Sequence, residues 1–409
     1  MVGEIKLTQP VLSASRRAGA PQALALILAM TLPVTPLLSL VPNLPQLFQH
    51  FASTPNRDFL VPMIITMPSV CIALLAPIAG SLADRFGRRR LMLLAVVLFT
   101  VCGLLPLWLE DLKQILLAQL GVGVAEAIIM TTGNTLLGDY FDSAARQRWL
   151  GVQGILGSIL ATLILLAGGA LGTINWHMPF LMNSLGGVVL VWMLLTTWEP
   201  SQSGAHATDT GDSADAGFPW RAMRIVFGVT LLIAVLYFVQ TVELGLMFSK
   251  LGASSSALIS LLTTVASIGV IAGGWWYRRQ KQVSVAVNIT TILLAYAIGL
   301  IGLGLSATPG VGLPFGIVAQ FGNGLVVPVL VGWALRTLDF RYRGRGMGLW
   351  TTLFFCGQFI SPTLVALLTR MRAGDFLGAI VIVGIVCGVL AIPAALIARR
   401  APAVPAVIT

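Results

Sequence analysis

Twelve apolar runs, each about 20 residues or longer and separated by short polar breaks, account for most of the 409 residues of this chain. A helix rises about 1.5 Å per residue and the hydrocarbon core of a bilayer is about 30 Å thick, so each run can cross a membrane. With 57% hydrophobic and 10% charged residues, the chain is too apolar for a soluble fold of this length. We therefore predict an all-α polytopic membrane protein. The predicted spans are residues 22–50, 59–82, 91–109, 113–138, 148–172, 178–198, 222–248, 255–277, 283–306, 312–336, 346–369 and 375–398.

A charged turn, residues 80–90 with the sequence GSLADRFGRRR, separates the second and third runs. Four of its last six residues are arginines, which enter hydrocarbon only at high cost. Short loops rich in Lys and Arg remain on the cytoplasmic side during insertion. The turn is therefore predicted to be cytoplasmic, which fixes the orientation of the chain. Because the number of spans is even, both termini are expected in the cytoplasm, with the protein in a bacterial inner (plasma) membrane.

The spacing Gly-x-x-x-Asp-Arg-x-Gly-x-Arg-Arg in this turn resembles the signature between the second and third helices of the major facilitator superfamily. An ordinary positive-inside loop explains the arginines but not Gly80, Asp84 and Gly87. The resemblance implies twelve transmembrane helices in two pseudo-symmetric six-helix bundles, the major facilitator fold. In that family the aspartate locks the two halves together by meeting the positive N-terminal end of the eleventh helix. It therefore implies a cytoplasmic gate signature at Gly80, Asp84, Arg85, Gly87, Arg89 and Arg90, with Arg88 in the same basic surround.

A polar stretch rich in small residues, 199–221, is the only long interruption of this type inside the chain. We interpret it as a flexible cytoplasmic linker between two bundles. Asp139-Tyr140-Phe141 after the fourth span is echoed by Asp339-Phe340 after the tenth, which favours a duplicated unit with the solute site between the halves. The predicted domains are a cytoplasmic tail at 1–21, a first bundle at 22–198, the linker at 199–221, a second bundle at 222–398 and a tail at 399–409.

The formal net charge of +10 has the same origin as the orientation. On the predicted topology, 20 of the 25 Lys and Arg residues fall in cytoplasmic segments. Bases scattered over short loops indicate the insertion bias and exclude a nucleic-acid-binding face. The five bases predicted outside are Arg57, Lys113, Lys250, Arg370 and Arg372.

Glu126 and Glu243 are the acidic residues inside the predicted spans. A charged acid in mid-bilayer costs roughly 2.5 to 3.5 kcal/mol, so such residues usually face the bundle interior and have a function. Removal from water favours the neutral carboxyl, which lets it load and release a proton. Glu126 lies at the centre of its span, on one helical stripe with Gln119, Gly123 and Met130. We predict proton coupling at Glu126 and Glu243. A structural role also stands: Glu126 could hydrogen-bond a neighbouring helix, and Glu243, nearer the interface, could reach water.

Other polar and aromatic side chains recur in spans expected to line a central cavity. An aromatic-rich cavity with few hydrogen-bonding groups suits an amphipathic organic solute better than a sugar, whose hydroxyls need many partners. Aromatic residues in membrane helices also serve packing or face lipid, and that alternative stands. The predicted cavity residues are Asn43, Gln119, Met130, Tyr237, Gln240, Gln320, Asn323, Trp350, Phe354, Phe355 and Gln358.

An enzyme is not expected. His50, His177 and His206 lie in loops or at span ends, and we predict that they form neither a metal site nor an acid–base constellation. No Walker-type phosphate loop is present, so ATP-driven pumping by this chain is not expected either. We predict no cofactor and no metal.

The predicted function is proton-coupled secondary active transport by alternating access. The resemblance to drug:proton antiporters favours export of an amphipathic small organic compound, with cationic compounds among the candidates. Two departures weaken the antiporter interpretation: Leu117 stands where the family pattern has an arginine, and Ile164-Leu165 replaces a Gly-Pro pair. Proton-linked uptake of a small organic solute is the alternative, and a transport-dead sensor or a membrane enzyme is the alternative of another class. The expected partners are a small-molecule substrate, protons and the lipid bilayer, with the protein acting as a monomer.

Overall fold

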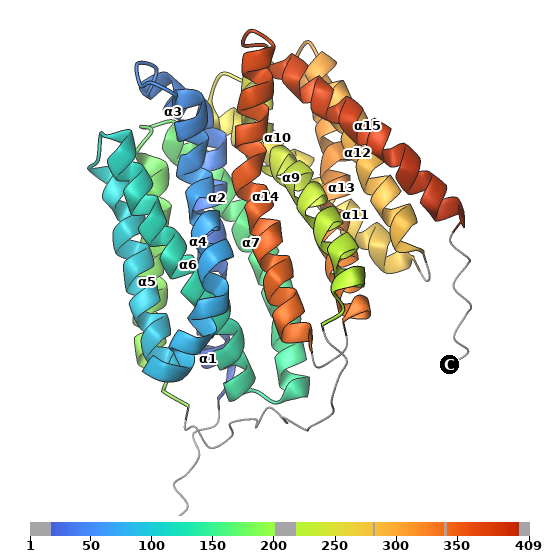
Figure 1. Cartoon of the computed structure of the whole chain (residues 1–409). Helices are drawn as coiled ribbons and strands as arrows, with labels where there is room; N and C mark the ends of the chain where they lie inside the picture. Colours follow the sequence, from blue (N-terminus) through green and yellow to red (C-terminus); the bar gives the residue numbers. More distant parts are fainter. Residues whose placement is uncertain (1–17, 201–217, 281–282, 339–341, 401–409) are drawn as a thin grey trace, which may run out of the picture.

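The computed structural model describes residues 18–200, 218–280, 283–338 and 342–400, and within these ranges the chain is helical and contains no strand (Figure 1). Twelve stretches are long and apolar enough to cross a membrane. Their ends agree with the predicted spans within three residues everywhere except at the end of the second. The stretches are Ala20–His50, Arg57–Leu75, Arg88–Leu107, Leu112–Tyr140, Arg148–Gly172, Met178–Thr196, Trp220–Lys250, Ser256–Arg279, Val285–Leu305, Pro309–Thr337, Gly346–Met371 and Phe376–Ala398.

Most spans are a single helix, and a few are divided. We call the spans between residues 20 and 196 the first half and those between 220 and 398 the second half. The elements are α1 (Ala20–Thr31), η1 (Leu32–Val34), α2 (Thr35–Leu40), η2 (Val41–Asn43), α3 (Leu44–His50), α4 (Arg57–Phe86), α5 (Arg88–Leu104), η3 (Leu105–Leu107), α6 (Leu112–Tyr140), α7 (Ser143–Gly172), η4 (Met178–Ser184), α8 (Leu185–Thr196), α9 (Trp220–Lys250), α10 (Ser256–Ala266), α11 (Ile268–Arg279), α12 (Val285–Leu305), α13 (Pro309–Thr337), α14 (Arg343–Met371) and α15 (Phe376–Arg400).

Proline divides the first span. Pro33 lies in η1 and Pro42 in η2, two 3-10 turns that interrupt the helix. Proline removes a backbone donor, so the carbonyls before it need other partners. Asn43 supplies one, because its Nδ2 donates to the Ser39 carbonyl at 2.7 Å and to the Gly168 carbonyl of α7 at 3.0 Å. The broken span is thereby fixed against α7.

The charged turn between α4 and α5 is held by the end of the first half. Gly87 has φ 88° and ψ 132°, a conformation that favours glycine. The Glu199 carboxylate accepts from the backbone N–H groups of Arg89 and Arg90 at 3.1 and 3.2 Å, so it caps the start of α5. Arg88 pairs with Asp139, at the end of α6, at 2.5 Å. We call this end of the molecule the signature end.

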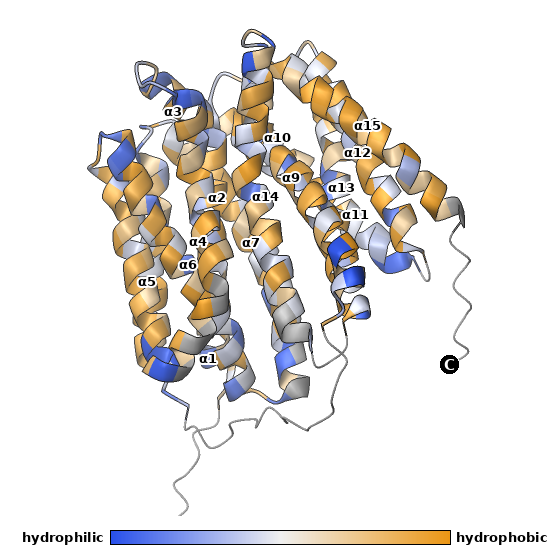
Figure 2. Cartoon of the chain, viewed as in Figure 1, coloured by the Kyte–Doolittle hydropathy of each residue, from blue (hydrophilic) through white to orange (hydrophobic). Residues whose placement is uncertain are grey.

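The two halves touch through close helix contacts. Thr352 of α14 donates to the Ala73 carbonyl of α4 at 2.9 Å. Gly169 of α7 lies directly against Ser260 of α10, and Gly245 of α9 faces the Val41 carbonyl. Small residues allow this approach of backbones. Figure 2 shows apolar colour along the helices and hydrophilic colour gathered toward their two ends, as expected for spans in a bilayer.

The predicted domain boundaries stay a prediction. Residues 201–217, within the predicted linker, lie outside the described residues, as do 1–17 and 401–409 of the predicted tails. One apolar cluster joins buried residues of the first half alone, such as Phe99 and Met193. A larger one includes buried residues of both halves, from Leu40 to Ala391.

Candidate functional site

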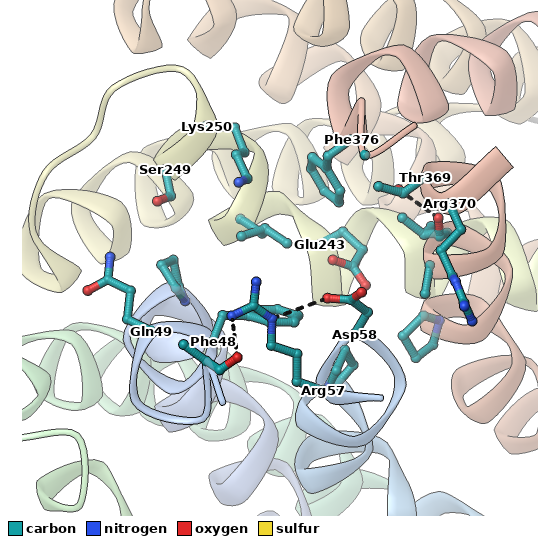
Figure 3. Close-up of a pocket in the computed structure, with 18 residues that line it drawn as sticks. Phe48, Gln49, Arg57, Asp58, Glu243, Ser249, Lys250, Thr369, Arg370 and Phe376 are labelled. Atoms are coloured by element: carbon teal, nitrogen blue, oxygen red, sulfur yellow. Dashed lines mark hydrogen bonds and ion pairs between the residues drawn. The ribbon is translucent and has the colours of Figure 1, made fainter. Parts of the chain in front are cut away.

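A cavity of about 780 Å³ lies between the two halves, at the end opposite the signature turn (Figure 3). The first half contributes the end of α3 and the start of α4, and the second half contributes the end of α9, the end of α14 and the start of α15. Its volume is in the range of small-molecule sites. We call this space the interhalf cavity.

Glu243 is the buried ionisable residue among those that line the interhalf cavity. It lies two turns before the end of α9, its exposed fraction is 2%, and it forms no hydrogen bond or ion pair with another described residue. Lys250 lines the same cavity seven residues later and forms no ion pair with it. Glu243 is therefore a carboxyl that adjoins the cavity without a compensating base.

Glu126 is buried at 3% exposure in α6, in the first half. One turn earlier, Gly123 packs against the backbone of Pro68 in α4, which places this part of α6 at the α4 contact. Glu126 forms no hydrogen bond or ion pair with a described residue, so the hydrogen-bonded structural alternative has no partner here. It does not line the interhalf cavity. Gln119, two turns earlier, is fully buried and its amide oxygen and nitrogen both lack partners, while Met130 is partly buried.

A buried hydrogen-bond network joins three helices of the second half. Asn323 of α13 donates from Nδ2 to Gln320 Oε1 at 2.7 Å and to Thr241 Oγ1 of α9 at 3.3 Å. Tyr296 of α12 donates to Asn323 Oδ1 at 2.5 Å. Gln240, next to Thr241, is fully buried with both amide atoms unpartnered. Sequence reasoning found Gln320, Asn323 and Gln240; it missed Tyr296 and Thr241, although each is a polar group inside an apolar span.

Aromatic rings of α9 and α14 form a cluster. Trp350 and Phe354 stack at 5.1 Å between centroids, and Phe354 contacts Tyr237 at 5.4 Å and Phe355 at 6.1 Å. Phe238, which was not predicted, contacts Phe354 at 5.2 Å. The Trp350 Nε1 is buried without a partner.

The remaining predicted cavity residues have different settings. Gln358 is buried one turn beyond Phe354 and Phe355. Asn43 uses its amide nitrogen to hold α7, and its Oδ1 is buried and unpartnered. The structure therefore gathers most of the predicted polar and aromatic residues in the second half, while Asn43, Gln119 and Met130 lie in the first. None of the eleven predicted cavity residues lines the interhalf cavity, so their place in a substrate path stays a prediction.

The gate signature is described in part. Arg85 is exposed, Gly87 forms the turn, and the backbone amides of Arg89 and Arg90 bind Glu199. Gly80 and Asp84 lie in α4, but their side-chain surroundings lie outside the described residues. The locking role of Asp84 stays a prediction.

Two of the three histidines lie beside one acid, a grouping that the sequence analysis did not predict. His50 Nε2 lies 3.3 Å from one oxygen of Glu110, and His177 Nε2 lies 3.5 Å from the other. Both imidazoles also contact the ring of Trp176, at 4.3 and 3.5 Å between centroids. The predicted topology places these loop residues at one end of the molecule, and that was the available signal. His206 lies outside the described residues.

Burial lowers the pKa of His177, and Glu110 opposes that shift. Among the described residues, no three His, Cys, Asp or Glu side chains are arranged to hold a metal ion. His177 is thus a titratable side chain at the cavity end of the first half.

Twelve helical spans in two halves, with a charged turn between the second and third, agree with the fold that the sequence resemblance implies. The sequence pattern of the Major Facilitator Superfamily matches residues 24–339, which is most of the chain. The chain belongs to the Major Facilitator Superfamily. Members of this family are transporters and not enzymes, and the twelve apolar spans support an integral membrane protein.

Individual relatives are more distant from this chain or match only part of it. The chain is 20% identical over 349 residues to the tetracycline resistance protein, class H, of Pasteurella multocida, covering 80% of this chain and 84% of that protein. It is 32% identical over 120 residues to the uncharacterised MFS-type transporter EfpA of Mycobacterium tuberculosis, covering 29% of this chain and only 23% of EfpA.

A solved bacterial homologue of the human lysosomal transporter Spinster, in an inward-facing and occupied conformation, has a similar fold. The TM-score is 0.73 at 15% identity, with 94% of this chain and 98% of that chain covered. At this identity the likeness establishes the fold alone.

Proposed function

We propose that this protein is a proton-coupled secondary active transporter that works by alternating access and exports an amphipathic small organic compound. One observation carries the proposal: each half holds a buried carboxyl, Glu126 or Glu243, without a hydrogen bond or ion pair to a described residue. A buried charge without a partner is costly, so such a carboxyl is tolerated when it binds a proton during part of the cycle.

The two carboxyls differ in access, which supports a division of labour. Glu243 adjoins the interhalf cavity and would exchange protons with the compartment at that end. Glu126 packs at the α4 contact and would exchange when the halves rearrange. With the signature end in the cytoplasm, the interhalf cavity faces outward. Both termini would then be cytoplasmic, in a bacterial inner membrane, and the protein would act as a monomer.

Export of an amphipathic compound is supported by the aromatic cluster and by the relatives. Tyr237, Trp350 and Phe354 offer apolar surface with a buried unpartnered Nε1 and, nearby on α9, the unpartnered amide of Gln240. Few polar groups among many rings suit a substrate with few hydrogen-bonding groups. The tetracycline resistance protein is named for resistance to a drug, which favours export over uptake.

The proposal is tested in everted membrane vesicles that hold an imposed pH gradient, reported by acridine orange. A transported compound should dissipate part of the gradient as protons leave in exchange for it. The Glu126→Gln and Glu243→Gln variants should lose this compound-dependent signal, whereas Glu110→Gln, which changes an exposed acid, should retain it. A signal that survives in the Glu126→Gln/Glu243→Gln double variant contradicts proton coupling at these residues. In vesicles with the pH gradient reversed, a compound that dissipates the gradient by entering together with protons indicates the uptake alternative.

A further inference from the structure

Bases are scarce at the end of the molecule opposite the signature turn, and they gather at one place. Of the five Lys and Arg residues assigned to that side, Arg57, Lys250 and Arg370 all line the interhalf cavity. They come from both halves and from three helices. Insertion bias explains why few bases lie at this end, but not why most of those few share one cavity.

The charges of the cavity do not cancel. Arg57 pairs with Asp58 at 3.7 Å and donates to the Ala52 carbonyl at 3.1 Å, so these two charges are matched. Lys250 forms no ion pair with a described residue. Arg370 forms none either; its guanidinium lies 5.6 Å over the Phe59 ring. With Glu243 as the remaining acid, the lining keeps a net positive charge whether Glu243 is protonated or not.

Apolar side chains surround these charges. Phe48 of α3 and Phe376 of α15 line the same cavity (Figure 3), and so does Leu246 of α9. A site with positive groups at an exposed rim and apolar walls matches a molecule with an anionic head and an apolar body.

We propose that the interhalf cavity binds the anionic group, a carboxylate or sulfonate, of an amphipathic substrate through Lys250 and Arg370. This inference rests on the proposed function, because it assigns the cavity to the transport path and specifies the substrate class. It replaces the cationic compounds that the sequence analysis kept among the candidates.

Binding to the purified full-length protein in nanodiscs of zwitterionic lipid tests the inference. The probes are dansylglycine, which carries a carboxylate, and dansylcadaverine, which carries an ammonium on the same fluorophore; empty nanodiscs supply the background. At low salt, the wild type should bind dansylglycine about fivefold more tightly than dansylcadaverine, since two exposed charges contribute modestly to the binding free energy. The preference should shrink with added salt.

Variants separate the cavity bases from other bases. The double variant Lys250→Gln/Arg370→Gln should lose the preference for dansylglycine. The charge-conserving double variant Lys250→Arg/Arg370→Lys should keep the preference, which controls for folding of the site. Lys113→Gln and Arg372→Gln remove bases at the same end that do not line the cavity, and they should leave binding unchanged. Asp58→Asn frees Arg57 from its partner and should tighten dansylglycine about twofold.

Equal binding of both probes by the wild type, or an unchanged preference in Lys250→Gln/Arg370→Gln, overturns the inference. Nanodiscs that contain phosphatidylglycerol distinguish the source of the anion: competition by that lipid assigns the site to a lipid headgroup and overturns the substrate assignment. If the probe preference follows the bases but no compound dissipates a pH gradient, the proposed function fails while the anion site stands. If a compound dissipates the gradient but the probe preference is absent, the proposed function stands and the anion site fails.

Discussion

The two ends of the molecule treat their charges differently. At the signature end, specific partners hold two of the charged side chains: Arg88 pairs with Asp139, and Glu199 accepts from two backbone amides at the start of α5. At the cavity end, Lys250, Arg370 and Glu243 share one space without pairing. Matched charges hold a turn in shape, whereas unmatched charges around a cavity are available to a solute or a proton. The comparison predicts that substitutions at the signature end reduce the stability of the fold, whereas substitutions at the cavity end reduce transport.

The largest expected effect is at Glu243. Glu243→Gln should reduce gradient-driven transport by about 5- to 150-fold, the range of a typical coupling free energy between two sites. Its melting temperature should stay equal to or above the wild type, because the change removes a buried acid that has no partner. Transport in proteoliposomes and thermal unfolding in detergent measure the two quantities. A lower melting temperature with intact transport would place Glu243 among the structural residues.

Gly87 is expected to show the opposite pattern. Gly87→Ala forces a side chain into φ 88°, ψ 132°, which costs of order 1 to 3 kcal/mol, and the new Cβ would lie 3.1 Å from the capping oxygen of Glu199. Gly228→Ala, inside α9 with open space around it, is the matched control and should stabilise by about 0.5 to 1 kcal/mol. Thermal unfolding compares the two; equal melting temperatures would mean that the turn is not constrained.

A smaller effect is expected at Glu199. Glu199→Gln keeps an acceptor for the amides but loses the negative charge at the start of α5, which is worth about 0.3 to 1 kcal/mol at an exposed site. The loss of stability should fade at high salt. A loss that is independent of salt would assign Glu199 a packing role instead.

The smallest expected effect is the pH dependence of the histidine cluster. Burial lowers the pKa of His177, so the unfolded chain binds a proton there more readily than the folded chain. The resulting stability is present above the ordinary histidine pKa, about 6.5, and is lost as the pH falls below it. The melting temperature of the wild type should therefore drop between about pH 7.5 and about pH 5.5 by more than that of His177→Gln. Parallel pH profiles of the two proteins would show that His177 does not contribute.

The spans were predictable because length and hydropathy determine them locally. Their ends agree within three residues at all but one position, since charged or turn residues stop most runs abruptly. Gln320, Asn323 and the rings of α14 could be singled out because polar or aromatic groups stand out in an apolar span. The partners that these side chains contact could not be predicted from the sequence. Tyr296 and Thr241 were missed because their roles depend on the packing of α9, α12 and α13.

The charge environment of the cavity end was less predictable. In the sequence, Lys250 and Arg370 could be counted only among the few bases outside the cytoplasmic segments. Residues 120 positions apart share a cavity only through tertiary structure, so their proximity could not be predicted. The grouping of the histidines was missed for the same reason: His50, Glu110 and His177 come from three separate segments.

Glu199, at the point where the chain leaves the first half, connects that segment to the charged turn through hydrogen bonds. Tyr140 also holds this segment, since its hydroxyl donates to the Trp198 carbonyl and accepts from the Trp198 amide. A pull on the polypeptide just beyond residue 199 would therefore be transmitted to the first turn of α5 through two amides, without passing through the apolar interior. A displacement of the chain at residues 198–199 would therefore also displace the turn where α4 ends.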